Sequence, residues 1–267
     1  MPDGSAFNEF YYRNCCGLPY ERNEQWLQFF GVIADRIVSD INPRRVLDAG
    51  CAIGLLVEAL RERQVDARGI DISSFAIDSV PVPLRAYCRQ GSIAEPLGER
   101  FDLIVCIEVL EHMTPEEADR ALTNFVAHTD DVLFSSTPFD YREPTHINVR
   151  MPEDWAEAFA RHGFYRDVDF DASFVTKWAA RFTRRSVPPS RLVRDYERRF
   201  WQARAAEHDA RAYSMELQQR LDAAEKARDH FEEIANKLRQ EVATRSRLFW
   251  RIRWLVAKIR RSWREEH

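Results

Sequence analysis

The chain has 267 residues, of which 45% are hydrophobic and 31% charged, enough apolar sequence for one main domain and an appendage. Disordered, collagen-like and low-complexity chains are excluded, and no apolar run approaches the ~20 residues that span a bilayer. Five cysteines follow no disulfide framework or metal-binding spacing. Because Met1–Gly4 also lacks the start of a secretory leader, we expect a cytoplasmic protein with reduced thiols.

Charge is distributed unevenly along the chain. The net charge is −4, but residues 245–264 hold eight Lys/Arg and no acid, so the remaining residues carry −12. A basic tail is therefore attached to an acidic body. An acidic body argues against nucleic-acid binding through a broad basic face and directs electrostatic attraction to the tail.

Periodicity predicts an α/β domain. Residues 23–39 are typical of an amphipathic helix, which we expect to pack on the edge of a sheet. From there to about Phe170, β-rich runs alternate with helical runs, which predicts a doubly wound, Rossmann-like and mostly parallel sheet. The expected strands are 45–49, 67–71, 85–89, 101–107, 131–135 and 164–170, and the expected helices between them are 55–63, 115–128 and 152–162.

After Pro188-Pro189 the composition becomes helical, and apolar residues recur with a heptad period to about Val242. This pattern predicts a long C-terminal coiled coil, as a dimer or trimer, over the alternative of a lone solvated helix. One core position recurs from Tyr196 to Leu238 and the other from Val193 to Val242. Glu207, Ser214 and Arg228 interrupt these positions, and we expect self-association through the remainder.

Residues 245–267 are typical of a basic amphipathic helix. Leu248, Ile252, Leu255, Ile259 and Trp263 recur at helical spacing, and three of the seven tryptophans lie here. Such a helix suits the headgroup region of an anionic membrane; a docking helix for a protein partner and an RNA-binding helix are the alternatives. We therefore expect four parts: an N-terminal helical and aromatic cap (1–40), an α/β domain (41–186), a coiled coil (190–244) and a basic helix (245–267).

The turn after the first expected strand indicates a cofactor site. Asp48-Ala49-Gly50-Cys51-Ala52-Ile53-Gly54 leads into a helix, and glycines let the backbone approach a ligand, although steric demands of the turn alone also explain them. Asp71, at the end of the next strand, could accept hydrogen bonds from both ribose hydroxyls or could cap a helix. Phosphate binding is disfavoured because Ala52 stands where a phosphate loop prefers glycine, and no Lys-Ser/Thr follows.

With these motifs the sequence resembles the class I S-adenosylmethionine (SAM) methyltransferases, of the type associated with bacterial surface-polysaccharide glycosyltransferases. The resemblance covers about Leu18 to Arg184 and includes the run from Phe101 to His112, which is similar to the family's fourth strand and following loop. It implies SAM as cofactor. We expect Ala52 to be tolerated if its φ is negative.

The resemblance also implies roles for individual residues. Gly50 and Gly54 would line the methionine end of SAM, Asp71 would hold the ribose, and Ile72 would cover the adenine. The full expected cofactor set is Asp48, Gly50, Cys51, Gly54, Asp71, Ile72, Ser92 and Ile93, with Ser92 standing where the family often has an aspartate.

Methyl transfer to a hydroxyl needs alignment and a base. Glu108, Glu111 and His112 follow the fourth strand, and His146 lies in the loop after the fifth, so all four can meet at the carboxyl edge of the sheet. We expect His146, Glu111 and His112 to be catalytic. The same four residues could hold Mg²⁺ or Mn²⁺. Their arrangement resembles that of the small-RNA 2′-hydroxyl methyltransferases and some quinone-ring methyltransferases, in which a Glu-x-x-Glu-His motif supplies metal ligands.

Two simpler interpretations of these residues stay open. Glu108 and Glu111 could cap the next helix with His112 at the surface, or His146 could act as a base without metal. For the acceptor, we expect contacts from Tyr20 and Asp140. The aromatic residues near Tyr11 and Tyr20 could form a lid or pack on the sheet edge.

The sequence thus predicts a SAM-dependent O-methyltransferase acting on a sugar hydroxyl of a cell-surface glycan or lipid-linked saccharide. We expect it to be cytoplasmic and peripheral on the inner face of the membrane. The alternatives are an RNA 2′-O-methyltransferase with a metal site, for which the acidic body makes RNA an unfavoured partner, and a non-catalytic coiled-coil scaffold that retains the fold.

Overall fold

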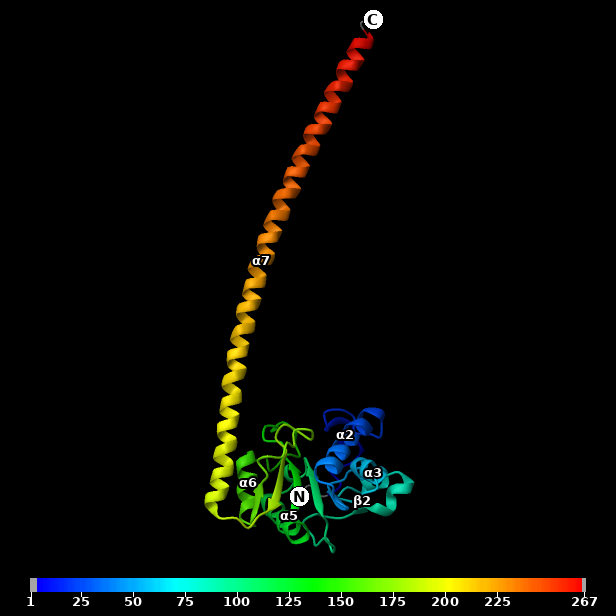
Figure 1. Cartoon of the computed structure of the whole chain (residues 1–267). Coiled ribbons are helices and arrows are strands. Elements are labelled where there is room, and N and C mark those ends of the chain that lie inside the picture. Colours follow the sequence, from blue (N-terminus) through cyan, green and yellow to red (C-terminus); the bar gives the residue numbers. More distant parts are fainter. Residues whose placement is uncertain (1–3, 266–267) are drawn as a thin grey trace. The chain divides into compact units, whose positions relative to one another are not determined.

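The computed structural model describes residues 4–265, without the side chains of Ile259, Arg260 and 262–265 (Figure 1). The expected contributions of Met1–Asp3 and of the Ile259, Arg260, Trp263 and Arg264 side chains lie outside the described residues. The chain divides into two compact units, the first ending at Tyr196 and the second beginning at Glu197.

The first unit is built on a seven-stranded sheet with the order β3-β2-β1-β4-β5-β7-β6. Strands β1 to β5 run parallel, and β7 pairs antiparallel with β5 and β6. The expected α/β class and mostly parallel sheet are confirmed. The strands are β1 Arg45–Ala49, β2 Asp66–Asp71, β3 Cys88–Gln90, β4 Leu103–Ile107, β5 Asp131–Ser135, β6 Phe164–Arg166 and β7 Ala180–Arg184.

Three strand predictions need correction, and one strand was missed. Strand β4 begins at Leu103 instead of Phe101. Residues Val82–Tyr87 form the 3-10 helix η1 with prolines at its start, so β3 begins only at Cys88. Strand β6 ends at Arg166 instead of Phe170. Strand β7 was not predicted, because its alternating ARFTR pattern follows an irregular loop and offers only two apolar residues, Ala180 and Phe182.

One face of the sheet is covered by α1 (Glu9–Asn14), α2 (Glu24–Asp40), α3 (Leu55–Glu62) and α4 (Ser74–Asp78). Helix α2 begins where the Asn23 side chain accepts the Trp26 N–H. Its Ile33 and Ile37 are fully buried in the core that includes Val46 of β1. Helix α2 therefore covers the face of the sheet, and its predicted position at the edge was wrong.

The opposite face is covered by α5 (Pro115–His128) and α6 (Pro152–Ala160). Thr114 and Glu117 form a capping box that fixes the start of α5. The second core beneath these helices contains Leu47, Ile104 and Trp155. Between β4 and α5 lies the short 3-10 helix η2 (Leu110–His112), which holds two of the predicted catalytic residues in the carboxyl-edge loop.

Helix α7 (Pro189–Glu265) is one continuous helix of 77 residues, about 115 Å long at 1.5 Å per residue (Figure 1). It passes without a break through residues 244 and 245, where we expected a coiled coil to give way to a separate basic helix. The long C-terminal helix is confirmed, and its pairing as a coiled coil stays a prediction. Among residues 4–265, no helix has the length and hydropathy needed to cross a membrane.

Candidate active site

The loop between β1 and α3 needs glycine at its first position. Gly50 has φ 93°, and a Cβ atom there would lie 2.3 Å from Val109 Cγ2. Both the left-handed backbone and the approach of Val109 from the β4 loop therefore demand glycine. Gly54, with φ 79°, is the N-cap residue of α3 and does not line the cavity described below, in contrast to its predicted contact with the cofactor.

Ala52 adopts a conformation that we did not expect. Its φ is 45°, in the left-handed region, so the condition of negative φ was wrong. Its N–H donates to Asp71 Oδ2 at 2.8 Å. This hydrogen bond ties the middle of the loop to the end of β2 and offsets part of the backbone strain.

Asp71 and Asp48 lie under the loop. Asp71 is 8% exposed, and its second oxygen accepts the Ser73 N–H at 2.8 Å. Burial raises the pKa of Asp71, and these backbone donors oppose that shift. Burial, and then the nearby Asp71 carboxylate, raise the pKa of Asp48 to about 8. Asp71 therefore fixes the loop through backbone hydrogen bonds, and it also lines the cavity in which we predicted the ribose.

A cavity of about 870 Å³ connects this loop to His112 and His146, two of the three predicted catalytic residues, whereas the third, Glu111, is fully buried and not among its lining residues. Seven of the eight predicted cofactor residues line it, all except Gly54, as do Tyr20, Asp140, His112 and His146. Ser92 uses its hydroxyl to accept the Ala94 N–H at 3.1 Å, which caps a local turn. The cavity is large enough for a nucleoside-sized ligand together with an acceptor.

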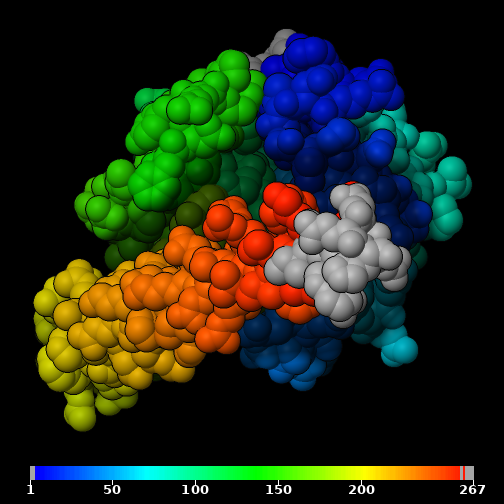
Figure 2. All heavy atoms as spheres, turned by 90° about the horizontal axis from the view of Figure 1, so that it is seen from above, coloured from blue at the N-terminus to red at the C-terminus, as the bar shows by residue number. Residues whose placement is uncertain are grey.

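The N-terminal segment closes one side of this cavity. In Figure 2 the N-terminal residues (blue) and green residues from the middle of the chain lie side by side on one face of the domain. The Ser73 hydroxyl donates to the Phe7 carbonyl at 2.5 Å, and the Tyr11 hydroxyl lies 3.3 Å from His112 Nε2. The segment therefore contacts both the cofactor side and the catalytic side of the cavity. These contacts agree with the predicted lid, and packing on the sheet edge alone would not explain them.

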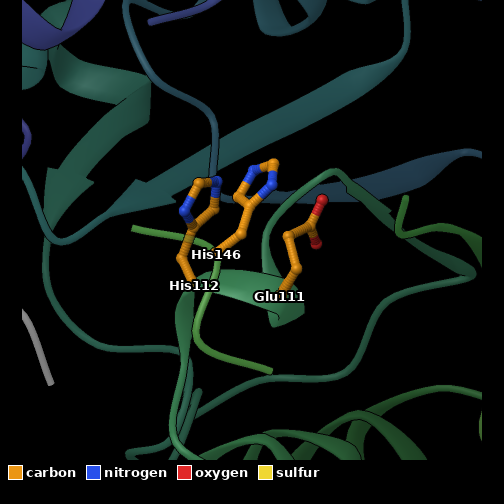
Figure 3. Close-up of side chains that lie close together, drawn as sticks. All are labelled: Glu111, His112 and His146. Carbon is orange, nitrogen blue, oxygen red and sulfur yellow. The ribbon is translucent and has the colours of Figure 1, made fainter. Parts of the chain in front are cut away.

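Glu111, His112 and His146 come together as predicted, with one ligand atom of each lying within 4.8 Å of the others. Figure 3 shows the three side chains pointing to the same side, with the two imidazole rings beside each other. The ring centroids of His112 and His146 are 4.6 Å apart. Glu111 is fully buried and His112 is 9% exposed, so the alternative of a surface histidine was wrong.

A directional chain of hydrogen bonds fixes His112. The Thr145 hydroxyl donates to Glu143 Oε2 and therefore accepts from His112 Nδ1, 2.8 Å away. This leaves Nε2 as the acceptor for Tyr11. Burial, and then the neighbouring His146, lower the pKa of His112 to about 4, so the ring is neutral at physiological pH.

His146 has the geometry of a base. Its Nδ1 donates to the Asp140 carbonyl at 2.8 Å, which leaves Nε2 as a proton acceptor, and His146 lines the cavity. The Glu143 carboxylate, 8% exposed, lies 3.7 Å from that Nε2 and would stabilise the imidazolium formed on proton uptake. Sequence reasoning missed Glu143, although its place in the same loop as His146 was a usable signal.

The two glutamates of the motif play different parts. The Glu108 carboxylate accepts from the Ser135 hydroxyl and, at 2.9 Å, from Trp178 Nε1, and it is not part of the cluster formed by Glu111, His112 and His146. Its predicted role as a metal ligand is not supported by this geometry. Neither glutamate caps the following helix, because Thr114 and Glu117 do so.

Glu111 is the residue that fits a cation. No group among the described residues hydrogen-bonds to its buried Oε2. Burial, and then Glu108, raise the pKa of Glu111 well above its usual range. A carboxylate and two imidazoles suit a divalent transition ion such as Mn²⁺ better than Mg²⁺. A metal would also supply the missing partner of Oε2.

The predicted acceptor contacts lie at different parts of the cavity. The Tyr20 ring is 4.8 Å from Trp26, and the charge of Asp48 contributes to its raised pKa after burial, so Tyr20 belongs to the cofactor end. Asp140 is exposed and accepts the Arg142 N–H at 3.2 Å, and Lys177 lines the same cavity. Lys177 lies in the loop before β7, and its position could not be anticipated because β7 itself was not predicted.

Comparisons with known proteins agree with this arrangement. A family model described as a methyltransferase domain matches residues 20–167. The chain is 33% identical over 102 residues to the ubiquinone biosynthesis O-methyltransferase of Alkalilimnicola ehrlichii, covering 35% of this chain and 41% of that protein. For the same enzyme of Bordetella avium, identity is 30% over 122 residues, covering 42% of this chain and 47% of the relative.

The chain therefore spans less than half the length of these relatives. Among solved structures, the SAH-bound magnesium protoporphyrin IX methyltransferase of Synechocystis PCC 6803 superposes with a TM-score of 0.50. The sequences are 17% identical, and the match covers 67% of this chain and 98% of that one. This likeness confirms the fold.

Proposed function

Because the chain belongs to the methyltransferase-domain family, we propose that it transfers a methyl group from SAM to a sugar hydroxyl of a cell-surface glycan or lipid-linked saccharide at the cytosolic membrane face. One observation carries the proposal. A single cavity joins the loop around Asp48 and Asp71 to His146, so donor and acceptor can meet there.

The SAM sulfonium supplies an electrophilic methyl group when bound. Asp71 and the loop hold the donor, and the lid residue Tyr11 limits the access of water. The acceptor oxygen forms its bond to the methyl carbon as the carbon–sulfur bond breaks, and sulfur keeps the electron pair. His146 Nε2 takes the hydroxyl proton, and Glu143 stabilises the resulting imidazolium.

A metal has a defined place in this scheme. Glu111, His112 and His146 would hold it, and it would lower the pKa of an acceptor hydroxyl. His112 Nε2 would have to release Tyr11 to bind a metal through that atom. Metal-free catalysis by His146 and metal-assisted catalysis therefore predict different effects of chelation.

The cavity wall supports a saccharide acceptor. Phe139 and Trp178 offer flat apolar surfaces on which sugar rings stack, and Asp140, Arg142 and Lys177 offer polar groups for hydroxyls. A phenolic hydroxyl is the second candidate acceptor, favoured by the ubiquinone biosynthesis relatives. RNA 2′-O-methylation and a non-catalytic scaffold are not favoured.

The C-terminal part of α7 supports a membrane location. Exposed cations and tryptophans alternate between residues 245 and 258, with Arg253 over the Trp250 ring and Lys258 over the Trp254 ring. Such a surface attracts anionic headgroups and inserts aromatic rings at the interface. A lipid-linked acceptor would lie in the membrane to which this surface binds.

The test uses labelled SAM with lipid-linked saccharides and, in parallel, with catechol-type phenols. We expect transfer to the saccharide, and His146→Ala should reduce turnover by at least 100-fold while SAM affinity changes less than threefold. His208→Ala, a substitution on exposed α7, is the control and should be neutral. Transfer to the phenol alone would overturn the saccharide assignment.

A further inference from the structure

The apolar stripe of α7 extends beyond the heptad run predicted from the sequence, which ended at about Val242. The core positions that include Val193 and Tyr196 recur every seven residues through Phe249, Ile252 and Val256 in the same register of one unbroken helix. We call these positions, from Val193 to Val256, the seam. The tail is therefore a continuation of the seam as well as a basic segment.

The seam has large apolar side chains exposed along its length. Exposed fractions include 64% for Phe200, 53% for Leu221, 69% for Phe231, 63% for Val242 and 58% for Phe249. If each apolar seam side chain buried about 50 Å², two copies would bury on the order of 1,500 Å², the size of a standard stable interface. A second copy of this chain is thus a sufficient partner.

The polar seam positions indicate the direction of pairing. They are Glu207, Ser214, Arg228 and Arg245. In a parallel pair in register, each would face itself, which brings together two Glu207 carboxylates, two Arg228 guanidiniums and two Arg245 guanidiniums. Three like-charge layers destabilise that arrangement.

An antiparallel pair centred near residue 226 removes all three conflicts. Glu207 of each chain then faces Arg245 of the other, and Arg228 faces the small Ala224. Apolar seam residues face one another through the rest of the overlap: 196 with 256, 200 with 252, 203 with 249, 210 with 242, 217 with 235 and 221 with 231. The Ser214–Leu238 and Arg228–Ala224 layers each combine a polar with an apolar residue, and neither brings like charges together.

From this complementarity we infer that α7 pairs antiparallel with α7 of a second copy of this chain. Glu207 already lies 2.6 Å from Arg211 of its own chain, and the partner's Arg245 would join this pair. Trp250 and Trp254 lie off the seam, so pairing leaves them available to a lipid surface. The inference does not depend on the acceptor or on methyl transfer.

The full-length chain and its charge variants test this pairing by sedimentation equilibrium. We expect a dimer, and Glu207→Arg should raise its dissociation constant at least tenfold, because it places two cations opposite each other twice. Adding Arg245→Glu to that variant should restore the dimer. Glu216→Arg makes the same charge change off the seam and is the matched control.

Each result of this experiment either supports or contradicts the antiparallel pairing of α7. In a parallel pair, Glu207→Arg would replace one like-charge layer by another, and the double exchange would restore nothing. A monomeric full-length chain, a dimer indifferent to Glu207→Arg, or a double variant that stays weakened would each overturn the antiparallel pairing. Circular dichroism of every variant ensures that a lost dimer is not a lost helix.

Discussion

The sharpest prediction concerns Asp71→Ala and SAM affinity. A carboxylate that accepts two ribose hydroxyls loses both hydrogen bonds in this variant, at about 1–2 kcal/mol each. The resulting 2–4 kcal/mol corresponds to a roughly 30- to 1,000-fold weaker dissociation constant. The backbone N–H groups of Ala52 and Ser73 also lose their acceptor, so the variant should unfold at a lower temperature.

Isothermal titration calorimetry with SAM measures the affinity, and differential scanning calorimetry without ligand measures the loss of stability. Asp78→Ala is the control, because Asp78 is an exposed aspartate at the end of the neighbouring helix α4. Asp78→Ala should leave both quantities unchanged. An Asp71→Ala protein that is folded and binds SAM with unchanged affinity would refute the role of Asp71 at the ribose.

Three further predictions concern pH, metal and the tail. Burial raises the pKa of Asp48 to about 8, so the contribution of Asp48 to folding stability is full below about pH 4 and is lost as the pH rises toward 8. Between pH 5 and 8 the free energy of unfolding of the ligand-free wild type, measured with urea, should therefore fall by about 2–4 kcal/mol more than that of Asp48→Asn. Parallel pH profiles of the two proteins would contradict this. If a metal assists, EDTA should lower turnover at least tenfold and Mn²⁺ should restore it better than Mg²⁺, whereas full activity in chelator eliminates the metal. Removing residues 245–267 should abolish sedimentation of the protein with anionic vesicles at low salt and leave methyl transfer to a soluble acceptor unchanged. Equal sedimentation of the shortened and full-length chains would refute the membrane role.

The parts of the fold with strong periodicity were predictable from sequence. β1, β5 and α5 begin and end at the predicted residues, because alternation, capping residues and apolar spacing agree there. The short strand β3 was misplaced because prolines shape the segment before it. Strand β7 was missed because a short strand with only two apolar residues after an irregular loop carries little local signal.

The candidate site was predictable where residues follow a strand end. The carboxyl edges of β1, β2, β4 and β5 bring Asp48, Asp71, His112 and His146 to one cavity, as parallel topology requires. Side-chain direction was not predictable. Glu108 turns toward Trp178, a partner 70 residues away, and only the folded loop before β7 reveals that contact.

Backbone strain at the cofactor loop was not predictable from the sequence either. Ala52 and Glu108 both have positive φ, at 45° and 52°, although neither residue type favours it. Each is held by long-range hydrogen bonds, to Asp71 in one case and from Ser135 and Trp178 in the other. Strain of this kind gathers at ligand sites, where the surrounding structure compensates for it.

The most direct measurement of the central claim is mass spectrometry of surface glycans, quinones and RNA from cells that lack this chain, with wild-type or His146→Ala protein restored. We predict that one O-methyl group disappears from a saccharide in the deletion strain, returns with the wild-type protein and stays absent with the variant. Unchanged glycans, with the methyl group lost from quinones or RNA instead, would contradict the proposed function.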